Sequence, residues 1–361
     1  MKLAMLAVAI LAMAGCRTPA REAPQFQVDP SWPKIPNGWV LGQVSSAATD
    51  ERDHVWVLHR PRVVRAGLKT GPPVMEFDAA GNYIQGWGGP ATGYDWPESE
   101  HGIYVDYKGY VWICGSGDDD QVLKFTKAGK FVMQIGRRGR KKSNQYPGSF
   151  WKPTEMAVYP KTNELFVADG YGNKRVIVFD ADTGAFKRMW GAFASIPTDG
   201  PATPVSTGIP AKEIDPKDPG PPQFDTVHGI KVSNDGLVYV SDRGGKRVQV
   251  FTIDGKFVAQ AFIDRWCEAP HCGNGQTVAA TAFSADAAQR LLYVASRSPA
   301  RIWVLDRMTL KPLDSFGRPG VAPGEFYVLH HLTTDSKGNL YASEVEDGRR
   351  IQKFSQIKPA Q

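Results

Sequence analysis

The sequence predicts an all-β protein built as a six-bladed β-propeller. A strand–turn–strand pattern recurs at intervals of roughly 50 residues, a period typical of repeat folds. The fourth copy shows a complete unit of four short strands, HGIKVS, GLVYVSD, RVQVFT and KFVAQAFI, with hairpin turns at SNDG and TIDG. The 361 residues include 37 glycines and 27 prolines, which supply turns between many short strands. Six such units in a ring would leave only short, protected sheet edges.

The N-terminal residues predict export. Residues 1–16, MKLAMLAVAILAMAGC, combine a lysine, an apolar run and small residues in the manner of a secretory signal, and the run is too short to span a bilayer. Ala14, Gly15 and Cys16 resemble a lipobox. We therefore expect a periplasmic lipoprotein that reaches the membrane only through a lipid on Cys16. Ordinary cleavage to a soluble periplasmic protein is the alternative.

The remaining elements follow in chain order. Residues 17–37 are expected to form a linker and a ring-closing strand, and residues 38–357 the propeller. Copy six, from Leu329, ends after its third strand, RIQKFS, so the FQVDP segment near the N-terminus is predicted to supply the missing strand. The Pro- and Gly-rich stretch 195–224 is long enough for a lid, with a surface insertion as the alternative. The five earlier copies begin near residues 40, 101, 153, 227 and 278.

Three histidines occupy the same phase of the repeat, in every second copy. His101, His228 and His330 each open the first strand of their unit. Alternate units of a six-unit ring lie about 120° apart around its axis, so the three imidazoles are predicted to converge there. Three histidines with an open fourth position suit a catalytic zinc. The alternative for each histidine alone is a structural hydrogen bond.

Four further side chains are predicted at the same mouth of the ring. The first two strands of a unit are antiparallel, so the second strand ends beside the start of the first. Arg60, Arg243 and Arg297 stand at that end in copies one, four and five, and Tyr171 follows it in copy three. Arginines aimed into a metal cavity would hold an anion. Solvated loop charges are the alternative for the arginines, and a loop cap for Tyr171.

The cysteines and the net charge say less about function than the histidines and arginines do. Cys267 and Cys272 lie in the short loop CEAPHCGNG, for which a disulfide is expected in an exported protein; a metal site with His271 would match no standard spacing. Cys114 is expected to be a buried free thiol. The net charge is +6, and the basic run at 137–142 accompanies no nucleic-acid recognition motif, so we expect no nucleic-acid partner.

Several short motifs together resemble a known family. The motifs are GQVS at 42–45, His59 with Arg60, His101 with Gly102, ADGYGNKR at 168–175, DTVHGI at 225–230, Asp242 with Arg243, and His330. Over roughly residues 40–355 the chain resembles the peptidyl-α-hydroxyglycine α-amidating lyase domain, a six-bladed propeller of NHL-type repeats. The resemblance implies zinc on the three histidines and cleavage of a carbinolamide, R–CO–NH–CH(OH)–COOH, to an amide and glyoxylate.

The resemblance also implies roles. Tyr171 would take the hydroxyl proton, while Arg60 and Arg243 would hold the substrate carboxylate. His331 stands where animal members carry an acidic calcium ligand, so calcium is not expected, although the backbone carbonyls of Ala47 and Ile103 could hold a cation.

The resemblance leaves the partners and the function class open. The expected partner is a small-molecule or peptide carbinolamide, bound by a monomer. Two other classes stay open. One is a non-catalytic NHL scaffold that binds a protein or glycan. The other is a lactonase-like hydrolase, which would call for carboxylates and asparagines around an axial calcium.

Overall fold

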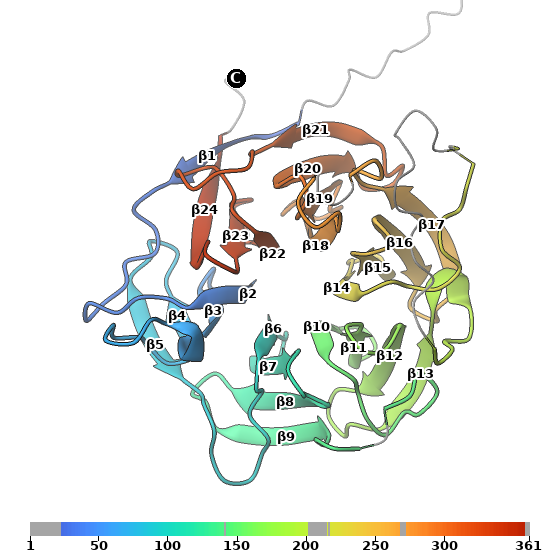
Figure 1. Ribbon diagram of the computed structural model, residues 1–361, viewed down its shortest axis with the longest axis horizontal. Coiled ribbons are helices and arrows are strands. Elements are labelled where there is room, and N and C mark those ends of the chain that lie inside the picture. Colours follow the sequence, from blue (N-terminus) through green and yellow to red (C-terminus); the bar gives the residue numbers. More distant parts are fainter. Residues whose placement is uncertain (1–22, 141, 201–214, 216, 268–271, 358–361) are drawn as a thin grey trace, which may run out of the picture.

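Six four-stranded antiparallel sheets surround a central axis in the computed structural model, which describes residues 23–140, 142–200, 215, 217–267 and 272–357 (Figure 1). The predicted six-bladed propeller is confirmed. Blade one contains β2 (Gln43–Thr49), β3 (Val55–Arg60), β4 (Val74–Phe77) and β5 (Tyr83–Trp87). Blade two contains β6 (Glu100–Val105), β7 (Tyr110–Gly115), β8 (Gln121–Thr126) and β9 (Phe131–Gly136). Blade three contains β10 (Pro153–Tyr159), β11 (Glu164–Asp169), β12 (Arg175–Asp180) and β13 (Phe186–Trp190).

The second half of the ring repeats this order. Blade four contains β14 (Val227–Val232), β15 (Leu237–Asp242), β16 (Arg247–Thr252) and β17 (Phe257–Phe262). Blade five contains β18 (Val278–Phe283), β19 (Leu291–Ser296), β20 (Arg301–Asp306) and β21 (Pro312–Phe316). Blade six contains β22 (Leu329–Thr334), β23 (Leu340–Glu344) and β24 (Arg350–Ile357), and takes its outer strand from the N-terminal β1 (Gln25–Asp29). In every blade the first strand lies nearest the axis (Figure 1).

The ring is closed by the two ends of the chain. Strand β1 pairs antiparallel with β24, from Gln25 opposite Ile357 to Asp29 opposite Lys353 (Figure 1). Phe26 of β1 stacks on Phe316 of blade five, with ring centroids 4.9 Å apart. The predicted N-terminal closing strand is therefore confirmed. It covers the edge of β24, which would otherwise expose unpaired backbone groups.

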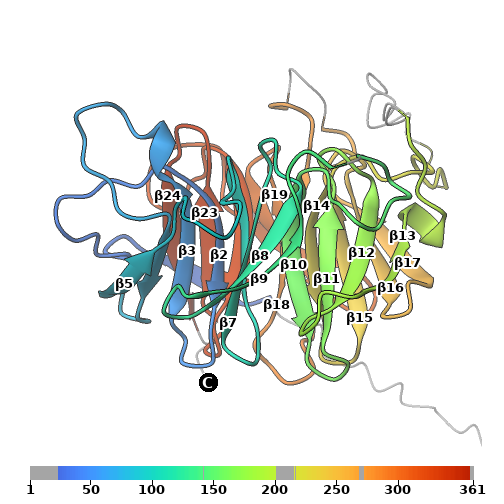
Figure 2. The ribbon, with the colours of Figure 1, turned by 90° about the horizontal axis from the view of Figure 1, so that it is seen from below.

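The core lies between the blades. Neighbouring blades pack face to face, so a middle strand is buried on both sides: all six residues of β11 are buried. The ring seen edge-on in Figure 2 has loops at both ends of the strands. Each of the three histidines is the second residue of its strand, so all three lie near the same end of the blades. The described residues contain only two short 3-10 turns, Pro61–Val63 and Ala192–Ala194, and no helix among them has the length and apolar character to cross a bilayer.

Each blade has a β-bulge at the same place in its first strand. In blade two the register passes from Glu100 opposite Gly115 directly to Gly102 opposite Cys114, so His101 has no partner across the ladder. A bulge turns the side chain of the extra residue out of the alternating pattern. Histidines occupy the bulges of blades two, four and six. The six bulged residues are Ser45, His101, Thr154, His228, Ala279 and His330.

Candidate metal centre

The six bulges are joined in three pairs around the axis. Each histidine bulge bonds through Nδ1 to the backbone carbonyl of the bulged residue in the next blade. An imidazole nitrogen that faces a carbonyl must carry the proton, so Nε2 keeps its lone pair. The pairs are His101 with Thr154 (2.8 Å), His228 with Ala279 (2.6 Å) and His330 with Ser45 (2.6 Å). The alternation of blades therefore sets the orientation of all three imidazoles.

The three imidazoles converge as predicted. One ring nitrogen of each lies within 4.8 Å of the others. The ring centroids of His101 and His228 are 4.9 Å apart, and His330 lies 4.7 Å from each. Each side chain is buried, and this burial holds all three pKa values well below the ordinary range of histidine. Three neutral donors that face one another fit a divalent metal such as zinc.

The Tyr171 hydroxyl lies against this trio. It is 3.3 Å from Nε2 of His101 and 3.2 Å from Nε2 of His228, and it accepts a hydrogen bond of 2.9 Å from Nη1 of Arg243. The guanidinium also lies over the Tyr171 ring, 4.9 Å from its centroid. A donor and a positive charge at the phenol oxygen stabilise negative charge there.

The turn after β11 brings Tyr171 to this position. Its backbone is bound to the preceding blade connection, because Tyr171 N donates to Lys152 O (3.3 Å) and Gly172 N donates to Trp151 O (3.0 Å). A Cβ on Gly172 would come within 2.2 Å of the Trp151 ring. Only glycine therefore allows this close approach of the turn to the tryptophan.

The three arginines end the second strands of their blades at equivalent positions. Arg60 is the last residue of β3, and Arg243 and Arg297 directly follow β15 and β19. Arg60 donates from Nε to Glu100 O (2.8 Å) and from Nη1 to Gln43 Oε1 (2.6 Å). Among the described residues, Nε of Arg243 is buried without a hydrogen-bond partner.

The electrostatics of the mouth favour an anion. Burial is the main cause that lowers the pKa of Arg297, and the charge of Arg243 lowers it further. The nearest acidic partner of Arg297 in the described chain is Glu346, with 3.8 Å between nitrogen and oxygen. A bound carboxylate would relieve the repulsion between these cations and use their free donors.

Comparisons with known proteins find similarity to NHL-repeat proteins and to amidating lyases. The family model for the NHL repeat matches residues 224–251. The chain is 26% identical to mouse NHL repeat-containing protein 3 over 92% of its own length and 85% of that protein. It is 29% identical to peptidyl-alpha-hydroxyglycine alpha-amidating lyase 2 of Drosophila melanogaster over 45% of this chain and 42% of that protein. The chain resembles amidating lyases. The match to mouse peptidyl-glycine alpha-amidating monooxygenase is 25% identical and covers 87% of this chain but only 30% of that protein.

The loops that carry the site are held by buried ion pairs that the sequence reasoning missed. In each pair, an aspartate that ends the second strand bonds to an arginine that begins the third. The pairs are Asp169–Arg175, with Nε 2.9 Å from Oδ2, and Asp242–Arg247, with 2.8 Å between the same atoms. All four side chains are buried. The signal was present in the similar segments ADGYGNKR and SDRGGKR, both of which end in a KR pair.

A charged cluster crosses the axis directly behind the histidines, and it was also missed. Glu155 and His331 follow the bulges of the opposite blades three and six, and Glu155 Oε1 lies 2.6 Å from Nε2 of His331. Glu155 also bonds to the ammonium of Lys231. Burial opposes ionisation of Glu155, but the charges and hydrogen bonds of Lys231 and His331 together outweigh it, and the pKa falls to about 2. Lys231 and His331 therefore already balance the charge of the Glu155 carboxylate within the protein.

This cluster does not fit calcium. Calcium takes about six to eight oxygen ligands, whereas the axis behind the histidines presents one carboxylate bound to an ammonium and an imidazole. The side chains of Ala47 and Ile103 pack in the hydrophobic clusters of blades one and two, and a cation on their backbone carbonyls stays a prediction.

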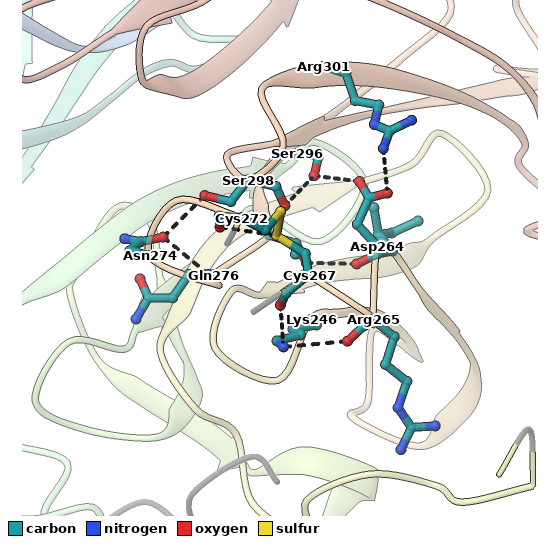
Figure 3. Close-up of a disulfide and its surroundings, with 12 residues drawn as sticks. Lys246, Asp264, Arg265, Cys267, Cys272, Asn274, Gln276, Ser296, Ser298 and Arg301 are labelled. Carbon is teal, nitrogen blue, oxygen red and sulfur yellow. Dashed lines mark hydrogen bonds and ion pairs between the residues drawn. A yellow bond between two sulfur atoms is a disulfide. The ribbon is translucent and has the colours of Figure 1, made fainter. Parts of the chain in front are cut away.

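The remaining sequence predictions lie away from the axis. Cys267 and Cys272 form a disulfide (Figure 3), and Cys114 is buried and free. Cys16 and His271 lie outside the described residues. Of the stretch considered as a lid, residues 217–224 pack on blade four, where Arg247 donates to three of their carbonyls. Residues 201–214 and 216 are outside the described part. The three carbonyls belong to Pro219, Pro221 and Gln223.

Proposed function

We propose that this protein is a metal-dependent carbon–nitrogen lyase that cleaves an N-acyl α-hydroxyglycine to an amide and glyoxylate. The observation that carries the proposal is the arrangement at the axis. Three neutral imidazoles converge on one point, the Tyr171 hydroxyl lies within 3.3 Å of two of them, and Arg243 donates to that hydroxyl. His101, His228 and His330 would hold zinc. The similarity to amidating lyases supports this assignment.

The residues divide the reaction between them. Zinc, when bound, polarises the substrate hydroxyl and favours its ionisation. Tyr171 accepts the hydroxyl proton on its phenol oxygen. The hydrogen bond from Arg243 stabilises negative charge on that oxygen before the proton arrives. The oxygen then forms a carbonyl as the C–N bond breaks, and the departing nitrogen gains one proton, which balances the proton that the hydroxyl gave to Tyr171. The balance needs no water, nucleophile or redox partner.

The arginines orient the substrate. A carboxylate on the carbinol carbon would bind Arg60 and Arg243, which flank the histidines from blades one and four. Binding the carboxylate there places the hydroxyl toward the imidazoles and holds it for proton transfer. The same contacts retain glyoxylate until the amide has left.

The setting of the enzyme is part of the proposal. We place the protein outside the cytoplasm, as a monomer, with a lipid on Cys16 as its only membrane attachment. Its substrates would be small-molecule or peptide carbinolamides. A non-catalytic scaffold is the second candidate, and the similarity to NHL repeat-containing protein 3 over 92% of this chain favours it.

Metal analysis and a product assay separate the two candidates. The purified protein should contain one zinc per chain and release glyoxylate and benzamide in equal amounts from α-hydroxyhippurate. His228→Ala should lose both properties. Tyr107→Ala is the control, because Tyr107 is 51% exposed in the turn between β6 and β7, away from the three histidines. A protein with neither metal nor glyoxylate release would be a scaffold.

A further inference from the structure

A hollow of about 350 Å³ adjoins the metal centre between blades five and six. It shares Arg297 with the mouth of the site, and Val328 in its wall lies two residues before His330. Arg297 and Val328 therefore place the hollow beside the mouth that carries the histidines, and its volume suits a small ligand group.

The wall of the hollow is mostly apolar and aromatic. Trp266 and Tyr327 line it and are 46% and 47% exposed, so both offer open aromatic surface to a ligand. Pro299 and the disulfide cysteine Cys272 also line it. The polar side chains of Asn274, Arg297 and Ser298 complete the lining.

The described residues that flank the Cys267–Cys272 disulfide are held by contacts within the chain. Asp264 accepts a hydrogen bond from Ser296 Oγ (2.7 Å) and pairs with Arg301 (Figure 3). Asp264 also accepts a hydrogen bond from Trp303 Nε1 (2.8 Å). Such contacts reduce the entropy that these residues would lose when a ligand binds.

We propose that this hollow binds the acyl group of the substrate and selects carbinolamides whose acyl group is compact and apolar or aromatic. The assignment rests on the proposed lyase function. A carboxylate held by Arg60 and Arg243 leaves the acyl end of the substrate to extend past Arg297 toward Trp266 and Tyr327. The ring of a benzoyl group, or an apolar residue before the hydroxyglycine of a peptide, would pack against these side chains.

The test compares two substrates that differ only in the acyl group, α-hydroxyhippurate and α-hydroxy-N-acetylglycine. The wild type should prefer the benzoyl substrate in kcat/KM. Trp266→Ala and Tyr327→Ala should each reduce this preference about tenfold, chiefly through KM, and leave the acetyl substrate within about twofold. Tyr107→Ala is the control, since Tyr107 is 51% exposed in the turn between β6 and β7 at the other end of the strands.

Binding gives a second readout that needs no turnover. Hippurate should bind more tightly than N-acetylglycine in calorimetry, and both wall variants should remove the difference. Cleavage of both substrates with a preference that the variants do not change would refute the hollow as the acyl site while leaving the lyase function intact. No glyoxylate from either substrate would refute the lyase function and, with it, this assignment.

Discussion

Tyr171 is the side chain on which the proposed chemistry depends most. Tyr171→Phe removes only the oxygen that contacts His101, His228 and Arg243. As the loss of a general base, it should lower kcat by about 10²–10⁴-fold with little change in KM. Steady-state kinetics on α-hydroxyhippurate, with zinc content measured in parallel, checks this. Near-normal turnover by the variant would exclude Tyr171 as the base.

The arginines should differ in their effects because their surroundings differ. Arg60→Ala or Arg243→Ala should raise KM about 10–100-fold, since each removes a charged donor to the carboxylate. Arg→Lys at either position should restore little, because an ammonium cannot reproduce the planar fork of the guanidinium. Arg297→Ala should do less than either, as Arg297 lies beside the acyl hollow and near Glu346. Equal effects of all three variants would contradict this division.

The buried imidazole of His59 should make the free energy of unfolding decrease at acidic pH. Its Nδ1 accepts from Gly42 N (3.1 Å), its Nε2 donates to Pro72 O (3.0 Å), and burial lowers its pKa from 6.5 to about 4. The folded protein therefore resists protonation that the unfolded chain accepts. Stability is fully present above pH 6.5 and falls as the pH drops from 6.5 to about 4, by about 3 kcal/mol from this group.

His59→Gln tests that step, because an amide can replace both hydrogen bonds but does not titrate. Urea unfolding at pH 7.5 and pH 4.5 should show a smaller loss of stability in the variant than in the wild type. The axial histidines titrate equally in both proteins and cancel in the comparison. Equal losses would mean that His59 does not resist protonation.

How much of the site could be predicted depended on repetition. His101, His228 and His330 were identifiable because they recur in phase, and the arginines because they end equivalent strands. Glu155 was not, because nothing in the segment PTEMAVY distinguishes a buried glutamate from an exposed one. Its burial depends on Lys231 and His331, which come from blades far away in the chain.

At the scale of elements, the bulge is the unit that makes the centre. The strands were predictable from their length and from the Asp- and Gly-rich turns between them. The bulges were not, because serine, threonine and alanine occupy three of the six, and these residues carry no common signal. Their function lies in the backbone carbonyl that each offers to a histidine of the preceding blade. That contribution is independent of the side chain.

At the scale of the whole molecule, a metal on the axis would join blades two, four and six. A ligand that binds only the folded ring stabilises it. Removal of metal with EDTA should therefore lower Tm by roughly 5 °C and abolish glyoxylate release. Zinc should restore both and calcium neither, because Lys231 and His331 already match Glu155. Differential scanning calorimetry with each ion checks this, and a strict requirement for calcium would contradict it.

The pairing of β1 with β24 also determines when the propeller ring can close during folding. Gln25 meets Ile357, so the last contact to form joins the two ends of the described chain. During synthesis the early blades can assemble in order, since each is built from neighbouring segments. The ring itself must wait for its final strand. Until then the chain is an open arc with exposed strand edges, and this interval is when it is most open to pairing with other chains. Ring closure therefore pairs segments from the two ends of the described chain and covers the strand edge that could otherwise pair with another chain.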